Sequence, residues 1–279
     1  MTHFQYFERK IATLTHQGGS KNHWLIFLHG WMDNLESMRP LAEAFQDYSW
    51  CAFDLPGHGL SDPYPRSLPY HLLNTLPDMH ALIQHLGAKE VTLIGHSLGA
   101  GISALYSGAF PTQVKHLVLI DALAPLVDTP EQAIDRIAQY ADAEAKLQSK
   151  TPPAYTDLEP LIQKRHQIFP TQRPDLVRRI FERNMILQNG KWSWRLDPRI
   201  RITSLSRLSA ERIFESVKRI TCPALLIEGH AGYLKQFPQA EKVAQTFKNL
   251  KRVVHNGGHH IHLDATQAVA QSIRDFISP

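Results

Sequence analysis

A serine between two glycines stands where an apolar run gives way to small residues. Residues 91–101 read VTLIGHSLGAG, with Ser97 two positions from Gly95 and two from Gly99. This G-x-S-x-G pattern, at the junction of a strand and a helix, forms a sharp turn that projects the serine Oγ above a sheet. The start of the helix favours developing negative charge at that point. We therefore interpret Ser97 as a nucleophile, and the alternative is a tight turn with an incidental serine.

A second segment offers hydrogen-bond donors for the negative charge that attack by a serine creates. Residues 28–34 read LHGWMDN and directly follow an apolar run. The backbone N–H of Trp31 can turn toward the serine and form a two-donor oxyanion hole with the N–H of Leu98. Only the backbone of Trp31 is needed, so its side chain is free to be a packed core aromatic.

A third segment is rich in histidine. Residues 255–264 read HNGGHHIHLD and follow the last apolar run of the chain. A general base must reach the serine from a loop at the carboxyl end of the sheet, and His259 stands directly after two glycines in such a loop. We predict His259 as the base. A metal site made by the histidines of this segment is the alternative, but no nearby Cys or spaced carboxylates complete it.

Short apolar runs that end in turn residues predict the strands that position these groups. Near-continuous apolar runs indicate strands buried on both faces, as in a parallel sheet. The opening segment, 4–15, alternates more and suits an antiparallel edge pair. Helix-length segments separate the runs, so we predict a doubly wound α/β fold. The runs are 24–30, 50–57, 91–97, 116–122, 224–229 and 252–258, and the helical segments are about 36–46, 70–86, 98–109, 236–249 and 265–277.

One interval interrupts this alternation of strands and helices. About 100 residues between Asp121 and Pro223 contain no strand-like run and several amphipathic, Arg-rich helical stretches. Long segments inside compact domains usually carry function or structure of their own. We therefore assign 125–218 to an inserted helical cap, and the core domain then comprises 1–124 and 219–279.

The three chemical segments, in this order, resemble the α/β-hydrolase fold family over nearly the whole chain. DLPGHGLSD at 54–62 is similar to a turn common after the fourth strand of that family. Together with HGWMDN and with LDPRIR at 196–201, it resembles the serine hydrolase-like branch. The resemblance implies a mostly parallel sheet of eight strands and chemistry without a metal or cofactor. The residues that match the catalytic positions of the family are Ser97 as nucleophile, His259 as base, and Trp31 and Leu98 as oxyanion-hole donors.

The acid that would orient His259 is missing from the turn where this family most often has it. That turn follows residues 224–229 and reads GHAG, and its nearest carboxylate is Glu228, within the strand. The fold has a second position at the end of the sixth strand, as in some haloalkane dehalogenases, and Asp121 occupies it here. A carboxylate at either strand end can reach the Nδ1–H of His259. We predict Asp121; Glu228 and no acid at all are the alternatives, and Asp121 could instead cap the insertion.

Composition and charge exclude several classes of protein. The 279 residues carry a formal charge of +4, and the segment 159–219 contains fourteen Lys and Arg against six Asp and Glu. We interpret this segment as a solvated helical face, and attraction of an anionic ligand is the alternative. No recognisable nucleic-acid-binding module is present. No G-x-G-x-x-G or Walker pattern appears, so no cofactor is expected.

Cysteine usage and hydropathy bear on the compartment. Cys51 and Cys222 are the two cysteines of the chain and do not form a disulfide framework, which favours a reducing compartment. The first residues lack the apolar core of a secretory signal, and no apolar stretch approaches the ~20 residues that span a bilayer. We expect a cytoplasmic protein without a membrane span.

These observations together predict a serine hydrolase that cleaves an ester or related acyl bond of a small molecule through an acyl-enzyme. A C–C bond hydrolase or an acyltransferase would use the same triad. A non-catalytic binding protein with this fold is the alternative from another class; the empty acid turn favours it, and the intact Ser97 and His259 count against it. The sequence leaves the natural substrate and the oligomeric state open.

Overall fold

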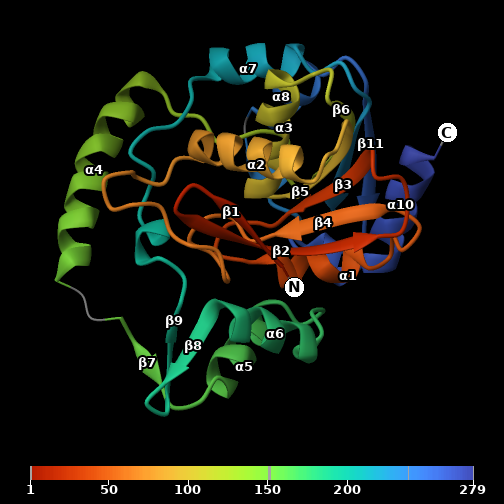
Figure 1. Ribbon diagram of the computed structural model, residues 1–279. Coiled ribbons are helices and arrows are strands. Elements are labelled where there is room, and N and C mark those ends of the chain that lie inside the picture. Colours follow the sequence, from red (N-terminus) through yellow and green to blue (C-terminus); the bar gives the residue numbers. More distant parts are fainter. Residues whose placement is uncertain (1, 150–151, 238, 279) are drawn as a thin grey trace.

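The computed structural model describes residues 2–149, 152–237 and 239–278. Its centre is an eight-stranded sheet in the order β1-β2-β4-β3-β5-β6-β10-β11, which confirms the predicted fold class (Figure 1). The pairs β1–β2 and β2–β4 are antiparallel, and the other neighbouring strands are parallel. The strands are β1 (Thr2–Tyr6), β2 (Arg9–Gln17), β3 (His23–Leu28), β4 (Ser49–Phe53), β5 (Glu90–His96), β6 (Val114–Ile120), β10 (Ala224–Gly229) and β11 (Leu250–His255).

Helices cover both faces of the sheet, and this explains why its central strands are apolar throughout. Phe27 and Leu225 pack with α1 and α10 on one face, whereas Ile26 and Leu226 pack with α2, α3, α7 and α8 on the other (Figure 1). The helices are α1 (Leu35–Ala42), α2 (Thr75–His85), α3 (Leu98–Ala109), α7 (Ala210–Lys218), α8 (Ala240–Ala244), α9 (Ile261–Asp264) and α10 (Thr266–Ile277), with short 3₁₀ turns η1 (Leu72–Asn74) and η3 (Leu234–Gln236). Helix α8 is much shorter than the segment 236–249 predicted for it.

The chain between β6 and β10 is not wholly helical, and in this respect the prediction of a helical insertion is wrong. The segment contains α4 (Pro130–Gln148), α5 (Glu159–Ile168), α6 (Pro174–Asn184) and η2 (Pro198–Arg201), together with a three-stranded antiparallel sheet in the order β7-β9-β8. Its strands are β7 (Ala154–Tyr155), β8 (Met185–Gln188) and β9 (Lys191–Trp194). Asn189 and Gly190 join β8 to β9 with φ of 51° and 71°, and Asn-Gly is the commonest two-residue hairpin turn.

Helix α7, the last helix between β6 and β10, packs against the core. Helix α7 lies against α3, and the approach is close enough that a Cβ on Gly108 would lie 2.3 Å from the backbone oxygen of Ser216. Ile213 and Val217 of α7 are buried in the same hydrophobic cluster as Ile26 and Leu226 of the sheet. Helix α7 therefore completes the core, while the small sheet packs with α5 and α6 around a hydrophobic cluster of its own (Figure 1).

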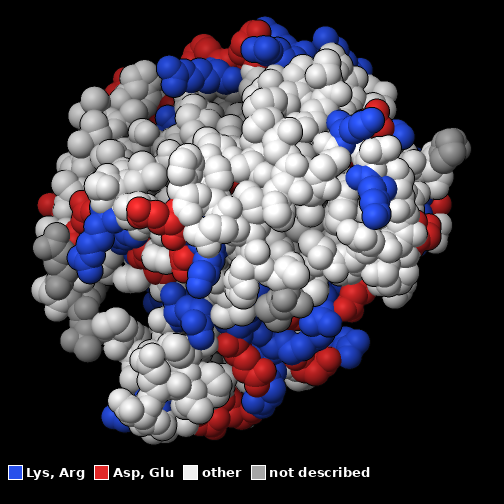
Figure 2. Space-filling model, in the orientation of Figure 1, with Lys and Arg blue, Asp and Glu red and all other residues white. Residues whose placement is uncertain are grey.

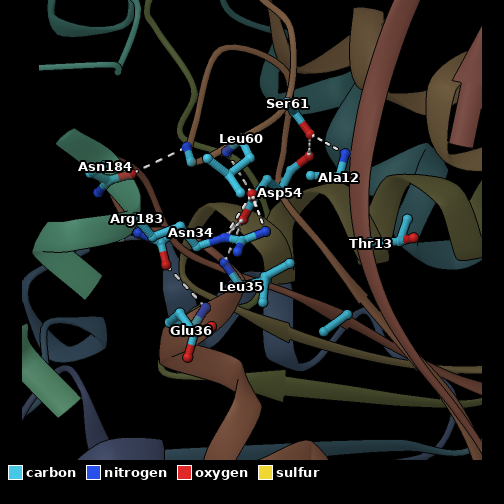
Figure 3. A network of polar contacts seen from close by, with 12 residues as sticks. Ala12, Thr13, Asn34, Leu35, Glu36, Asp54, Leu60, Ser61, Arg183 and Asn184 are labelled. Atoms are coloured by element: carbon cyan, nitrogen blue, oxygen red, sulfur yellow. Dashed lines mark hydrogen bonds and ion pairs between the residues drawn. The ribbon is translucent and has the colours of Figure 1, made fainter. Parts of the chain in front are cut away.

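A buried arginine of the insertion joins it to the core (Figure 3). The carboxylate of Asp54, in the loop after β4, accepts hydrogen bonds from the backbone N–H groups of Leu35 and Leu60, both at 2.8 Å. Arg183 of α6 forms an ion pair with it, with 2.8 Å between Nη2 and Oδ2, and both side chains are almost completely buried. A buried charge without its partner is strongly destabilising, so this pair holds α6 against the core.

Six of the eleven arginines of the basic segment, 159–219, form ion pairs with carboxylates. Figure 2 shows basic and acidic side chains interleaved around the lower part of the molecule rather than one basic field. The pairs within this segment or between it and other parts of the chain are Arg173–Asp175, Arg178–Glu159, Arg179–Glu36, Arg183–Asp54, Arg199–Asp197 and Arg207–Asp128. Within the described ranges, no helix is long and apolar enough to cross a bilayer.

Candidate active site

Ser97 occupies a strained turn between β5 and α3. Its backbone has φ 52° and ψ −112°, a conformation outside the helix and strand regions. Space requires the two flanking glycines: a Cβ on Gly95 would lie 2.3 Å from the Gly99 carbonyl oxygen, and a Cβ on Gly99 would lie 2.4 Å from that of Leu28. Such strain persists only where the surrounding structure enforces it, and it is characteristic of functional turns.

The carboxyl ends of neighbouring parallel strands bring three of the predicted residues together. Ser97 follows β5, Asp121 follows β6, and His259 lies in the loop after β11. The His259 Nε2 lies 3.0 Å from Ser97 Oγ, and its Nδ1 lies 2.6 Å from Asp121 Oδ2. A carboxylate accepts hydrogen bonds, so Nδ1 carries the imidazole proton and Nε2 accepts the hydroxyl proton of Ser97.

The turn after β10 has no carboxylate, but it holds the carboxylate of Asp121. The backbone N–H of Tyr233 donates to Asp121 Oδ2 at 2.9 Å, and that of Gly229 donates to Oδ1 at 3.4 Å. Gly232 leaves space for the same group, because a Cβ there would lie 2.0 Å from Oδ1. The Tyr233 ring also stacks on His259, with 4.5 Å between ring centroids. The turn therefore supports an acid supplied by the neighbouring strand.

Glu228, the alternative acid, is engaged elsewhere. Its carboxylate forms an ion pair with Arg252 on β11, with 3.0 Å between Arg252 Nε and Glu228 Oε1 and 3.2 Å between Nη2 and Oε2. Arg252 also reaches Glu241 of α8. The structure thus places Asp121, and not Glu228, against His259.

The predicted oxyanion donors lie on the wall of the site. Trp31 and Leu98 both line the cavity that contains Ser97, and neither backbone N–H donates to an acceptor among the residues that the structure describes. Gly30 brings the Trp31 loop close to the elbow, since a Cβ on it would lie 2.8 Å from His96 Nδ1. The Trp31 side chain is 56 % exposed and not a core aromatic; its Nε1 donates to the Ile200 carbonyl of the insertion at 2.9 Å.

Two buried histidines form hydrogen bonds that hold the loop containing Gly30 and Trp31. His29 Nδ1 donates to the Gly30 carbonyl at 2.8 Å, and its Nε2 accepts the N–H of Leu55 at 2.9 Å. His58 Nε2 accepts the N–H of Met32 at 3.3 Å. Burial lowers the pKa of His29 to about 4 and that of His58 to about 3, so both rings are neutral at pH 7 and can each donate from one nitrogen and accept at the other.

Further buried histidines lie behind the His259 imidazole. His96 Nε2 donates to the His259 carbonyl oxygen at 2.9 Å, which ties the elbow to the loop that carries His259. The His96 and His262 rings are 4.1 Å apart, and desolvation holds the pKa of both well below the usual value. His255 instead bonds to Ser272 of α10. In the described part of the chain, no group of three or more His, Cys, Asp or Glu side chains could hold a metal ion.

A cavity of about 860 Å³ opens beside Ser97. The core supplies residues from the loops after β3, β4, β5 and β6, and the insertion supplies residues from 200 to 213. The lining is predominantly apolar; Leu98, Ile102, Leu123, Ile213 and Val243 are among the side chains that form it. Cavities of this size, mostly apolar with a few polar groups, are typical of small-molecule sites.

This fold and this arrangement of serine, histidine and aspartate define the class of protein. Residues 23–266 match the family model described as alpha/beta hydrolase fold, and the chain belongs to the α/β-hydrolase family. Within that family it falls in the serine hydrolase-like branch. It is 30% identical to a probable serine hydrolase of Drosophila melanogaster, over 93% of this chain and 82% of the relative.

Two more comparisons agree with this assignment. A serine hydrolase-like protein of Danio rerio is 24% identical over 94% of this chain and 83% of its own. The crystal structure of a hypothetical protein from Pseudomonas aeruginosa PAO1 superposes with a TM-score of 0.90 and 28% identity, covering 100% of this chain and 99% of the other.

The sequence prediction did not identify the residues that hold the site in place. Gly232 and Tyr233 support Asp121, and His96 supports the His259 loop. Asp264 accepts the N–H of Gly258, one residue before the imidazole, at 2.9 Å. The sequence GHAG indicates a tight turn. That this turn contacts the Asp121 carboxylate follows only from the pairing of β6 with β10.

Proposed function

We propose that this protein is a serine hydrolase that cleaves an ester or related acyl bond of a small-molecule substrate through an acyl-enzyme. The observation that carries the proposal is the continuous hydrogen-bonded sequence from Ser97 through His259 to Asp121. This is the arrangement that activates a serine hydroxyl in enzymes of several unrelated folds.

The first half-reaction forms the acyl-enzyme. As Ser97 Oγ attacks the substrate carbonyl, its proton moves to His259 Nε2 and the carbonyl electrons move onto oxygen. Asp121, hydrogen-bonded to Nδ1–H, stabilises the imidazolium and keeps the tautomer. The tetrahedral intermediate then expels the alcohol, which takes the proton from Nε2. In the second half-reaction, water attacks the acyl carbonyl with His259 again as base, and the acid product leaves.

The oxyanion that forms in each step needs donors that are already in place. The free N–H groups of Trp31 and Leu98 support this role, since both line the cavity and lack protein acceptors within the described residues. Leu98 is also the first residue of α3, where the helix dipole favours negative charge. Donors fixed before the reaction act without reorganisation in the transition state.

We further propose that residues 125–218, which the sequence predicts as the cap, cover the site and select the substrate. Residues 200–207 contribute to the cavity wall, and the Trp31–Ile200 hydrogen bond links the oxyanion loop to this segment. The Arg183–Asp54 pair supports a fixed rather than a loosely attached cover. Helix α7, at the end of that range, packs with the core instead.

Hydrolysis of p-nitrophenyl esters tests the proposal. The wild type should release p-nitrophenol with kcat/KM well above the buffer rate, and Ser97→Ala should lose at least about 10³-fold in kcat. Ser107→Ala is the matched control, because Ser107 is also buried on α3 but its Oγ donates to the Ser103 carbonyl, away from the site. An active Ser97→Ala variant would refute the mechanism. A wild type that binds esters without cleaving them would favour a non-catalytic binding protein.

A further inference from the structure

The charged groups on the wall of the active-site cavity are unequal in sign. Among the described residues that line it, the one carboxylate is Asp121, which is buried and committed to His259. The cationic side chains on the same wall are Arg201 and Arg207. His58 and His71 also line it, and burial lowers the pKa of both, so they add no positive charge at pH 7. The wall is therefore apolar with an excess of positive charge.

Arg207 stands at the junction of this cavity with a second one. The second cavity has a volume of about 380 Å³ and shares part of its wall with the first. An isolated parallel β-bridge between Val127 and Leu208 fixes the backbone next to Arg207. The residues common to both walls are Leu126, Val127, Gln132, Arg207 and Phe237. Arg207 therefore lies where the two cavities meet. The wall of the smaller cavity also carries Asp128, Asp135 and Arg136.

The local carboxylate does not satisfy Arg207. Asp128 is already engaged by Arg136, whose Nε contacts Oδ2 and whose Nη2 lies 2.6 Å from Oδ1. Arg207 reaches the same Oδ1 with Nη1 alone, at 3.3 Å. Its other N–H groups donate to no acceptor within the described part of the chain. Two guanidinium groups thus share one carboxylate, and the second of them has donors free for an anion.

The electrostatic environment of Arg207 agrees with this geometry. Its pKa is lowered by burial first and by the nearby charge of Arg136 second, which means that its charge is incompletely compensated. An anion that entered the cavity would relieve both effects. Charge-assisted hydrogen bonds between a guanidinium and a carboxylate or similar oxyanion are among the strongest polar contacts in proteins.

We propose that the substrate is an acyl compound whose acyl chain carries an anionic group, and that Arg207 binds this anion while the ester carbonyl lies at Ser97. The inference rests on the proposed hydrolase function and adds a substrate class to it. The apolar wall between the two ends accommodates the methylene chain that joins them. Arg201 is not the binding group, because it is exposed and its guanidinium stacks on Trp194 at 4.8 Å.

Matched substrates test this assignment. p-Nitrophenyl monoesters of C4 to C10 dicarboxylic acids, with a free terminal carboxylate, are compared at low ionic strength with the same esters capped as methyl esters. The wild type should favour the anionic member by about tenfold or more in kcat/KM at the best chain length. Arg207→Gln should remove the preference, so that the ratio of kcat/KM for the anionic ester to kcat/KM for the neutral ester falls to about one, while Arg136 still pairs with Asp128. Arg201→Gln is the matched control and should keep the preference.

A binding measurement separates this inference from the proposed function. Calorimetry compares 7-oxooctanoate with the neutral 7-oxooctanamide, neither of which contains an ester. The wild type should bind the anion about tenfold more tightly or better, and Arg207→Gln should bind the two alike, with thermal melts showing both proteins folded. Equal binding in the wild type overturns the inference even if neutral esters are cleaved. Tighter anion binding without any ester cleavage supports Arg207 as the anion-binding group and refutes the hydrolase proposal. Loss of the preference in Arg201→Gln overturns the assignment to Arg207.

Discussion

Replacement of Asp121 by asparagine removes the negative charge that faces the imidazole and almost nothing else. The carboxylate is fully buried, its Oδ2 lies 2.6 Å from His259 Nδ1, and two backbone N–H groups fix its orientation. Asparagine can direct its carbonyl oxygen to His259 Nδ1 and the Tyr233 N–H. Its NH₂ group then replaces Oδ1 and cannot accept the Gly229 N–H, so only a long hydrogen bond of 3.4 Å is lost. The fold should therefore persist while the stabilisation of the imidazolium is lost.

The size of the effect follows from the separation of the charges. Two unit charges about 4 Å apart interact by about 4 kcal/mol at an effective dielectric constant of 20, and about 1.4 kcal/mol corresponds to a tenfold change in rate. Loss of the charge alone therefore lowers kcat by about 10³-fold. If the amide NH₂ faces Nδ1 instead, the imidazole adopts the wrong tautomer and the loss approaches the ~10⁴-fold seen in serine proteases.

The assay is steady-state hydrolysis of a p-nitrophenyl ester, with thermal melts to establish equal folding. The loss should appear in kcat with little change in KM, because Asp121 acts on the transition state through His259. Glu228→Gln is the control; Glu228 pairs with Arg252, so kcat should change less than about threefold. Near-normal kcat in Asp121→Asn would refute the reasoning, and an inactive Glu228→Gln beside it would transfer the role to Glu228.

Three further predictions concern the supports of the site and the stability of the fold. Gly232→Ala should lower kcat by at least about tenfold, because the new Cβ would displace Asp121, and an unchanged kcat would show that the turn does not hold the acid. Arg183→Met should lower the free energy of unfolding by about 3–5 kcal/mol in urea, against less than about 1 kcal/mol for Arg178→Met, whose pair is exposed. Buried neutral histidines whose pKa is lowered in the folded protein take up a proton only on unfolding, once the pH is below about 6.5. The free energy of unfolding should therefore fall by about 1.4 kcal/mol per histidine at pH 5.5. A free energy of unfolding that stays constant between pH 7 and 5 would contradict this. These histidines are His29, His58, His96, His260 and His262.

The fold and the chemical residues were predictable where the signal is local. Apolar runs identify strands buried on both faces, and the spacing of Gly95 and Gly99 around Ser97 reflects contacts within a few residues. The position of Asp121 beside His259 was predictable because Asp121 ends a strand next to that of Ser97 in the family sheet order, and parallel strands end at one edge.

The parts that could not be predicted depend on contacts between distant segments. Gly232 is required by a side chain 111 residues earlier in the chain, and no local pattern encodes such a contact. Arg183 appears in the sequence as one of many basic residues, although it is buried against Asp54. The hairpin at Asn189-Gly190 is different, because its turn signal is local, and the prediction of a helical insertion did not include it.

The covalent state of Ser97 tests the central claim most directly. Purified protein treated with a fluorophosphonate should gain one adduct per chain, and peptide mass spectrometry should locate it on the fragment that contains Ser97. Ser97→Ala should gain none, and His259→Gln should react at least about 10²-fold more slowly, because the hydroxyl then lacks its base. A folded wild-type protein that stays unlabelled, or that carries the adduct on another residue, would contradict the assignment of Ser97 as the nucleophile.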